Sequence, residues 1–191
     1  GEAEAVAKAV EKLGVPVYLS GMARGLLGRD LPLQMRHARR KALREADCVL
    51  LAGVPCDFRL DYGKHVRRSA TLIAANRSTK DARLNRTADI EAIGDAGRFL
   101  VALAHKSHGI ACPDWIATLS ARDAEREAEI DVQADASGQH VNPVAFFRAL
   151  EHAAGDDGRQ PLELAGLEKL CYELNPPEFG FGRPWRPQPA N

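Results

Sequence analysis

The sequence predicts an α/β protein built on a doubly wound, mostly parallel sheet, and three observations support this. Short apolar runs alternate with helix-length segments through about residue 106, and this alternation favours a parallel sheet because parallel neighbours need crossover helices. The run at 48–52 is apolar at every position, which is typical of a strand covered on both faces. A chain of 191 residues with 45% hydrophobic content can bury one main core.

The first elements follow from local patterns. A helix is predicted over residues 2–13, where apolar residues recur at helical spacing and Gly14 provides a stop signal. A β-rich run at 15–19 predicts a strand, and a glycine-punctuated loop at 20–25 follows it. A second helix is expected over 36–46.

The other expected strands come at intervals along the next fifty residues. After the strand at 48–52, a buried strand is predicted at 71–75 and a weaker one at 88–93, followed by a helix. Ligands of such sheets bind at the carboxyl ends of the strands. We therefore expect a ligand site in the loops that follow the strands, which are 20–25, 53–59, 76–78 and 94–95.

The remainder of the chain is expected to be a helical linker and a tail. Residues 111–154 contain a long charged helical stretch and a second helix, with Asn142 as its cap and Pro143 at its first position. Residues 155–191 predict a short helix and an extended, proline-rich tail. The main α/β domain is assigned to residues 1–110.

Composition limits the function classes. The chain has 26 Lys and Arg against 26 Asp and Glu, which argues against nucleic acid or an anionic membrane as a partner. No apolar stretch is long enough to span a bilayer, and the acidic start at residues 1–4 does not resemble a signal peptide, so a cytoplasmic protein is expected. The scattered cysteines lack a CxxC pair and are expected to be reduced, mostly buried thiols. They are Cys48, Cys56, Cys112 and Cys171.

Two side-chain clusters have an ordinary and a functional explanation. The spacing of His105, His108 and Cys112 could hold zinc, but such a pair of histidines without further ligands is usually solvated surface, so no metal site is predicted. The basic residues of the second helix could form an anion patch, although an exposed charged face is the ordinary explanation. These residues are Arg36, Arg39, Arg40, Lys41 and Arg44.

Several sequence blocks carry a resemblance to a known family. The blocks GMARGLLG at 21–28, RHAR at 36–39 and LAGVPCDFRLDYG at 51–63 occur in this order. They are followed by Asn76-Arg77, Asn85, Ile93-Gly94-Asp95, Trp115, Glu129-Ile130 and His140-Val141-Asn142-Pro143. The series resembles the central domain of thiamine-diphosphate-dependent enzymes, in the acetolactate-synthase-like and 2-hydroxyacyl-CoA-lyase-like branch. The resemblance covers roughly residues 3–150.

The resemblance implies a Rossmann-like domain of the DHS-like NAD/FAD-binding type, in the middle of a three-domain subunit. In this family the first domain supplies a glutamate that activates thiamine diphosphate, and the last holds the diphosphate through magnesium. The chain shows neither motif, because residues 155–158 have the wrong register for the magnesium motif and are better explained as a turn. We therefore expect a truncated relative that is not catalytic alone. Its expected partners are other domains or subunits of thiamine-diphosphate enzymes, and the parent is expected to be a homo-oligomer.

The resemblance also implies a nucleotide site for FAD or ADP in this domain. Glycine lets the backbone approach a ligand, arginine offers a forked donor to phosphate, and short polar side chains can meet hydroxyls. Pro55 stands where flavin binders usually carry arginine, which removes a charge and a backbone donor. Carried over by position, the candidate cofactor-binding residues are Gly21, Met22, His37, Gly53, Asp57, Arg59, Leu60, Asn76, Ser78 and Asp95.

Three functions remain open at this point. The first is a fragment of a thiamine-diphosphate-dependent carboligase or lyase, a transferase or lyase that joins or cleaves a bond next to a 2-oxo acid or 2-hydroxyacyl carbon. The second is a stand-alone module that binds FAD or ADP without turnover. The third is a structural piece that assembles with other chains. No residue of the chain is assigned a catalytic role.

Overall fold

A computed structural model of the chain describes residues 1–28, 30–135 and 140–153. These residues fall into two compact units, Gly1–Arg126 and the part that begins at Glu127. Each unit is described by itself. The short helix and the tail predicted within 155–191 lie outside the described residues.

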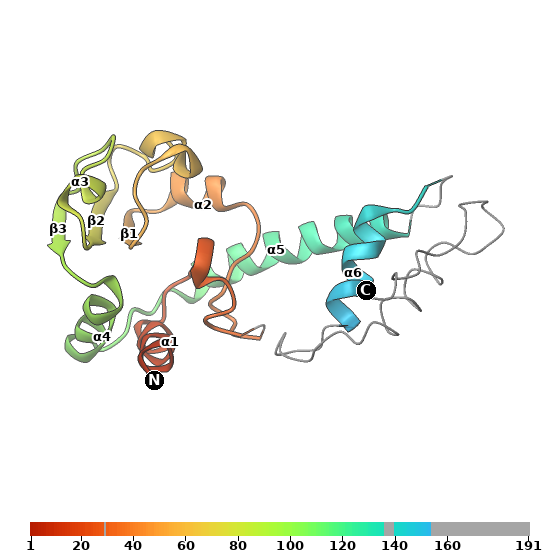
Figure 1. The fold of residues 1–191 in the computed structure, drawn as a ribbon, viewed down its shortest axis with the longest axis horizontal. Helices are drawn as coiled ribbons and strands as arrows, with labels where there is room; N and C mark the ends of the chain where they lie inside the picture. Colours follow the sequence, from red (N-terminus) through yellow and green to blue (C-terminus); the bar gives the residue numbers. More distant parts are fainter. Residues whose placement is uncertain (29, 136–139, 154–191) are drawn as a thin grey trace, which may run out of the picture. The chain divides into compact units, whose positions relative to one another are not determined.

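A three-stranded parallel sheet forms the centre of the first unit (Figure 1). Its strands are β1 (Cys48–Ala52), β2 (Thr71–Asn76) and β3 (Ile90–Ile93), in the order β1-β2-β3, and both pairs are parallel. Leu50 of β1 lies level with Ile73 of β2. The predicted α/β fold with a parallel sheet is thereby confirmed.

One face of the sheet carries the largest hydrophobic cluster. Val49 pairs in register with Leu72, and Leu51 with Ala74, so that these four side chains share one face. The most deeply buried of them, Leu72, is 1% exposed. The cluster also includes residues of three short elements, which are α2 (Arg39–Glu45), the 3₁₀ helix η2 (Phe58–Gly63) and α3 (Thr79–Ala82).

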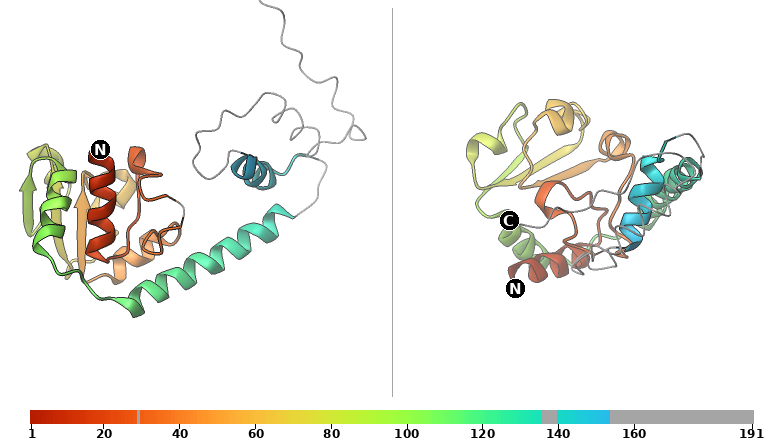
Figure 2. Two further views of the ribbon diagram at one scale, coloured as in Figure 1. Left: turned by 90° about the horizontal axis from the view of Figure 1, so that it is seen from below. Right: turned by 45° about the vertical axis from the view of Figure 1, so that its right-hand side comes forward.

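Two helices that contact each other flank the sheet on the other side (Figure 2). They are α1 (Glu2–Leu13) and α4 (Ala96–Lys106), and α4 also contacts β1 and β2. A β-carbon built at Gly97 would lie 2.9 Å from Cγ2 of Val6, so glycine permits the close approach of the two helices. Helices therefore flank the sheet as expected for a doubly wound fold.

The prediction of a strand at 15–19 was wrong. Only Val17 makes an isolated parallel bridge, to Gln34, with hydrogen bonds of 2.8 Å from its N–H to Leu33 and from Met35 to its carbonyl. The preceding residue is Pro16, which has no N–H to extend the pairing. The segment is consequently outside the sheet.

Helix α5 (Pro113–Ala134) begins inside the first unit. Its Leu119 is 1% exposed and packs in a cluster with Met35 and Ala42, next to Tyr18 and Trp115. The sequence predicted the helix, but not its contact with the segment before α2. The first turns of α5 are therefore an integral part of the α/β unit.

The second unit contains the end of α5 and helix α6 (Pro143–Ala153). As predicted, Asn142 caps α6: its Oδ1 accepts a hydrogen bond of 2.9 Å from the N–H of Val144. Arg148 of α6 pairs with Glu127 and Asp131 of α5. Among the described residues, no helix is both long and apolar enough to cross a bilayer.

Candidate functional site

The carboxyl ends of the three strands lie at one edge of the sheet and are joined by backbone hydrogen bonds. The N–H of Gly53 donates to the carbonyl of Ala75 at 2.8 Å, and the N–H of Gly94 donates to that of Asn76 at 2.9 Å. Gly53 has φ of 72°, a conformation that glycine adopts readily, and a β-carbon built there would lie 3.7 Å from Cβ of Ala96. The structure thus brings the loops after β1, β2 and β3 to the start of α4.

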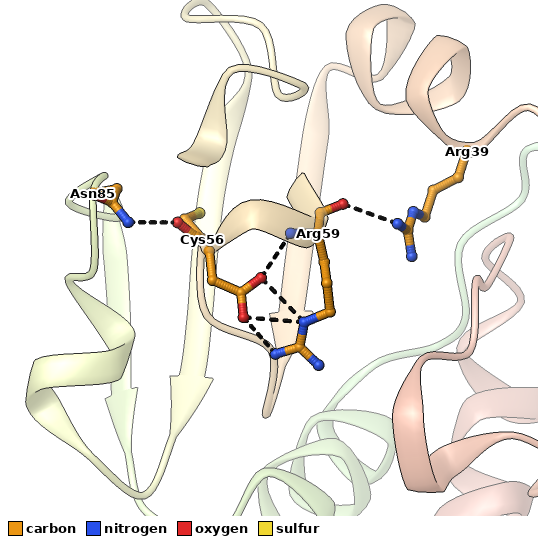
Figure 3. Close-up of polar contacts among 5 residues, drawn as sticks. Arg39, Cys56, Arg59 and Asn85 are labelled. Atoms are coloured by element: carbon orange, nitrogen blue, oxygen red, sulfur yellow. Dashed lines mark hydrogen bonds and ion pairs between the residues drawn. The ribbon is translucent and has the colours of Figure 1, made fainter. Parts of the chain in front are cut away.

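Asp57 and Arg59, in the loop after β1, form a closed ion pair (Figure 3). Nη2 of Arg59 lies 2.6 Å from Oδ2 of Asp57, its Nε lies 3.0 and 3.1 Å from the two carboxylate oxygens, and its backbone N–H donates to Oδ1 at 2.9 Å. Hydrogen bonding from the Arg59 side chain lowers the pKa of Asp57 below its usual value. The guanidinium fork is therefore engaged within the protein, and a phosphate group would have to compete with Asp57 for it.

The same loop is held from both sides. Nη2 of Arg39 in α2 donates to the carbonyl of Arg59 at 3.0 Å, and Nδ2 of Asn85 donates to the carbonyl of Cys56 at 2.9 Å (Figure 3). The side chain of Leu60 is buried in the main hydrophobic cluster, in contrast to the other candidate residues of this loop. The loop is consequently anchored by both polar and apolar contacts.

The polar candidates after β2 also make local hydrogen bonds. Asn76 is 8% exposed, and its Oδ1 accepts a hydrogen bond of 3.1 Å from the N–H of Ser78. Oγ of Ser78 accepts one of 3.2 Å from the N–H of Asp81 and so caps α3. These side chains thereby shape the turn that leaves β2.

Asp95, after β3, caps α4 and pairs with an arginine. Its Oδ1 accepts a hydrogen bond of 2.9 Å from the N–H of Arg98, and its Oδ2 binds the side chain of Arg77. The backbone hydrogen bond from Arg98, followed by the contact with Arg77, lowers the pKa of this carboxyl group. A ribose hydroxyl could reach Asp95 only by sharing it with Arg77.

Three further candidates lie before β1. Gly21 and Met22 belong to the 3₁₀ turn η1 (Gly21–Ala23), and the side chain of Met22 is fully exposed. The backbone N–H of His37 donates to Oδ1 of Asp123 at 2.9 Å. Among the described residues, the hydrogen bonds that join and shape the carboxyl ends of the strands do not involve Gly21, Met22 or His37.

Sequence reasoning missed the residue that holds the segment before α2. Asp123 of α5 accepts hydrogen bonds from the N–H groups of both Arg36 (2.6 Å) and His37, which are more than eighty residues away in the chain. Ala38 then adopts a left-handed backbone, with φ of 53°, and α2 begins at Arg39 instead of the predicted Arg36. Burial, together with the charge of Asp123, raises the pKa of the nearby Tyr18 to about 12. No local sequence pattern links such distant residues.

The described residues do not fit a metal ion or a reactive thiol. Among residues 1–28, 30–135 and 140–153, no group of three or more His, Cys, Asp or Glu side chains could hold a metal. Cys48, Cys56 and Cys112 are free thiols. Cys56 is buried as expected, but Cys48 is exposed because it begins β1 outside the core. Burial raises the pKa of Cys56, and partial desolvation at the exposed Cys48, with the nearby charge of Asp47, raises the pKa of that thiol as well, which disfavours the thiolate that a nucleophile requires.

Comparison with known proteins gives consistent matches. Residues 1–103 match the family described as thiamine pyrophosphate enzyme, central domain. The chain is 39% identical over 159 residues to 2-hydroxyacyl-CoA lyase 2 of Caenorhabditis elegans, a match that covers 78% of this chain and 25% of that protein. It is 41% identical over 165 residues to the human protein of the same name, a match that covers 81% of this chain and 26% of that protein.

A second kind of relative matches as well. The acetolactate synthase large subunit of Mycobacterium tuberculosis is 39% identical over 137 residues, covering 69% of this chain and 25% of that protein. The chain therefore spans about a quarter of the length of the curated relatives it matches. All the candidate strand-end residues lie within the part that matches the family.

Proposed function

Because the chain belongs to the thiamine pyrophosphate enzyme family, through its central domain, we propose that it serves as the central part of a thiamine-diphosphate-dependent carboligase or lyase. The proposed substrates are 2-oxo acids or 2-hydroxyacyl compounds, since the relatives named above are 2-hydroxyacyl-CoA lyases and an acetolactate synthase. The observation that carries the proposal is that both kinds of relative match most of this chain. In such an enzyme, bound thiamine diphosphate supplies the carbanion chemistry.

We propose further that the chain is not catalytic alone and acts as a scaffold for the parent enzyme. The carboxylates at the strand ends are paired within the chain, Asp57 with Arg59 and Asp95 with Arg77. The pKa values of the Cys48 and Cys56 thiols are raised, and no metal-binding cluster lies among the described residues. The magnesium expected for the family therefore has no fitting group of ligands among the described residues, and the proposed catalytic steps are assigned to the other domains of the parent enzyme.

A graft tests this proposal. The segment of human 2-hydroxyacyl-CoA lyase 2 that aligns with this chain is replaced by this chain, and the purified chimera is assayed for cleavage of a 2-hydroxyacyl-CoA with and without thiamine diphosphate. The expected result is thiamine-dependent cleavage by the chimera and no cleavage by the 191-residue chain alone. A folded chimera without activity, or turnover by the isolated chain, would contradict the proposal.

The second candidate function is a module that binds FAD or ADP. It is favoured by the convergence of Gly53, Asn76 and Asp95 at the strand ends, where an α/β sheet binds its ligands. Purified chain that is yellow would indicate FAD, whereas heat release on titration with ADP would indicate the adenine nucleotide. Asp95→Asn should weaken the binding of either ligand. The matched control is Glu91→Gln, which alters a carboxylate of β3 that pairs with Arg83. Absence of binding by both nucleotides would leave a purely structural role for the domain.

The assembly and location of the parent enzyme are part of the same proposal. We propose a cytoplasmic homo-oligomer whose subunits include the domains that flank this one in the family. Sedimentation of the active chimera and fractionation of cells that produce the natural enzyme test these two points separately. A monomeric active enzyme would overturn the first, and recovery in a membrane or organelle fraction would overturn the second.

A further inference from the structure

A basic surface lies on α2 and on the loop that follows η2. Arg40 and Arg44 stand one turn apart on α2, and both are exposed. Figure 1 shows α2 beside the segment of η2, and the hydrogen bond from Arg39 to the carbonyl of Arg59 joins the two elements. We define the basic surface by the residues Arg40, Arg44, Lys64, His65, Arg67 and Arg68.

The loop of the basic surface has a fixed backbone. The guanidinium of Arg86 donates to the carbonyls of Gly63 (3.4 Å), Val66 and Arg67 (3.0 Å), and the Val66 side chain is 2% exposed. These contacts hold the loop carbonyls on one side, while Lys64 and Arg67 remain exposed. The cations are thus carried by an ordered segment, which reduces the entropy lost when a ligand binds.

The arginines of this surface have no ion-pair partner among the residues that the structure describes. Elsewhere in the first unit, arginines pair with carboxylates, as Arg83 does with Glu91 and Arg122 with Glu45. The arginines of the basic surface make no ion pair with any carboxylate of the described residues. Like charges one turn apart, such as Arg40 and Arg44, disfavour a helix. Their juxtaposition is therefore not explained by the stability of α2.

His65 is a partly buried histidine near the arginines of α2. Its Nδ1 is buried and has no hydrogen-bond partner among the described residues. Burial lowers the pKa of His65, and the charges of Arg40, Arg44 and Arg39 lower it further, against the opposing effect of Asp61. Burial is the largest of these effects, and the arginines of α2 add to it.

We propose that the basic surface binds a small soluble ligand that carries at least two phosphate groups. Two arginine forks on one helix face match two phosphates better than ammonium groups would, because guanidinium binds phosphate oxygens in a bidentate manner. The surface uses none of the candidate side chains at the carboxyl ends of the strands, since α2 precedes the start of β1 at Cys48 and the loop precedes the start of β2 at Thr71. The inference goes beyond the proposed function and does not depend on it.

The test follows the His65 imidazole by NMR in the full 191-residue chain, with inorganic pyrophosphate as the probe and sodium chloride holding the ionic strength constant. An anion at this surface stabilises the imidazolium, so pyrophosphate should raise the pKa of His65 in a saturable manner. Arg40→Gln/Arg44→Gln should weaken the affinity by about tenfold or more. The control Lys80→Gln/Arg98→Gln removes the same charge from exposed positions on α3 and α4 and should leave the affinity unchanged.

The outcomes distinguish a specific phosphate-binding site from non-specific attraction of anions to a positively charged surface. A shift of His65 that sulfate or chloride reproduces at equal ionic strength would overturn the proposal, as would equal weakening in the control variant. A further experiment measures binding of the chain to vesicles that contain phosphatidylserine. Binding that is lost in the Arg40→Gln/Arg44→Gln variant would show that the surface binds a membrane instead of a small soluble ligand. If the double variant does not fold, the titration of the natural chain with pyrophosphate and with sulfate still decides between the outcomes.

Discussion

The two compact units of the chain are stabilised by different interactions. All the buried side chains among the described residues lie in Gly1–Arg126, including Leu72 and Leu119 at 1% exposure. Within 127–135 and 140–150, no described residue is buried, and the contacts include the cap of Asn142, the hydrogen bonds from its Nδ2 to the carbonyls of Gln133 and Ala134, and the ion pairs of Arg148. Helix α5 contributes to both units: its Leu119 is buried in the first, whereas its described residues in the second include none that is buried and two that pair with Arg148.

This difference has consequences for stability and for function. Burial of apolar side chains stabilises a fold more strongly than exposed ion pairs do, because water competes with the latter. The first unit is therefore expected to hold its strand-end loops in place, whereas the second is expected to respond more to salt and to changes at single polar residues. The following substitutions would break or sharpen this comparison.

The largest effect is expected in the core of the first unit. Leu72→Ala removes a side chain that is 1% exposed and leaves a cavity, which should lower the free energy of unfolding by about 3 kcal/mol. Ile93→Ala, on the exposed edge strand β3, is the control and should cost less than about 1 kcal/mol. Denaturant unfolding measures both, and equal losses would contradict the assigned core.

The next effect tests whether α5 belongs to the first unit. Asp123→Ala leaves the N–H groups of Arg36 and His37 without their acceptor and should cost about 2 kcal/mol. Hydrogen exchange should then speed up at these two amides. Glu125→Ala, at an exposed position of the same helix, should change neither stability nor exchange. Unchanged exchange in the Asp123 variant would show that α5 does not hold this segment.

A smaller effect is expected in the second unit. Asn142→Ala removes the cap of α6 and should destabilise that helix by about 1 kcal/mol. Exchange should increase over residues 143–150, while the amides of β1 and β2 remain protected. Asn142→Asp keeps an acceptor at the cap and is the matched control. Loss of protection in the sheet would contradict the separation of the two units.

The ion pairs of Arg148 should contribute less to the free energy of unfolding than the cap of Asn142 does. Arg148→Gln breaks the contacts with Glu127 and Asp131 and should cost no more than about 1 kcal/mol, because these side chains are partly exposed. The difference between the variant and the natural chain should disappear at high salt, where charges are screened. A difference that persists in high salt would indicate that the side chain contributes through packing.

The smallest effect is the pH dependence of the Asp57–Arg59 pair. The pKa of Asp57 is lowered in the folded state from an ordinary value of 3.8, so its contribution to stability is present above that pH and is lost as the pH falls through the lowered pKa. Arg59→Gln should raise the pKa of Asp57 toward the ordinary value, as measured by NMR of the carboxyl carbon. Lys64→Gln, nearby but without contact to Asp57, should leave it unchanged.

Much of the fold could be predicted from local sequence. Helix α1 matches its predicted bounds, β1 coincides with the apolar run at 48–52, and the cap of α6 at Asn142 was expected. The strand-end residues Gly53, Asn76 and Asp95 were expected at one edge of the sheet, which is where they lie. These predictions rest on interactions within a few residues, or on the general geometry of parallel strands. Whether the strand ends bind a nucleotide stays a prediction.

Other features depended on contacts between distant residues. The run at 15–19 has strand-like composition, but among the described residues it pairs with another segment only through the single bridge of Val17. Arg59 was expected to face phosphate, and its fork is closed on Asp57 instead. The pairing partner of a polar side chain depends on which elements pack together, and periodicity does not contain this information.

By itself, the sequence determined the longer helices, the three strands of the sheet and the family, because periodic burial, capping residues and characteristic blocks are local patterns. Only the tertiary structure decided that Asp123 holds the segment before α2, that Leu119 of α5 packs with the α/β unit, and that Arg40 and Arg44 lie near His65. The physical reason is that these features arise from side chains brought together across long stretches of chain, where the position of each depends on the packing of all the elements between them.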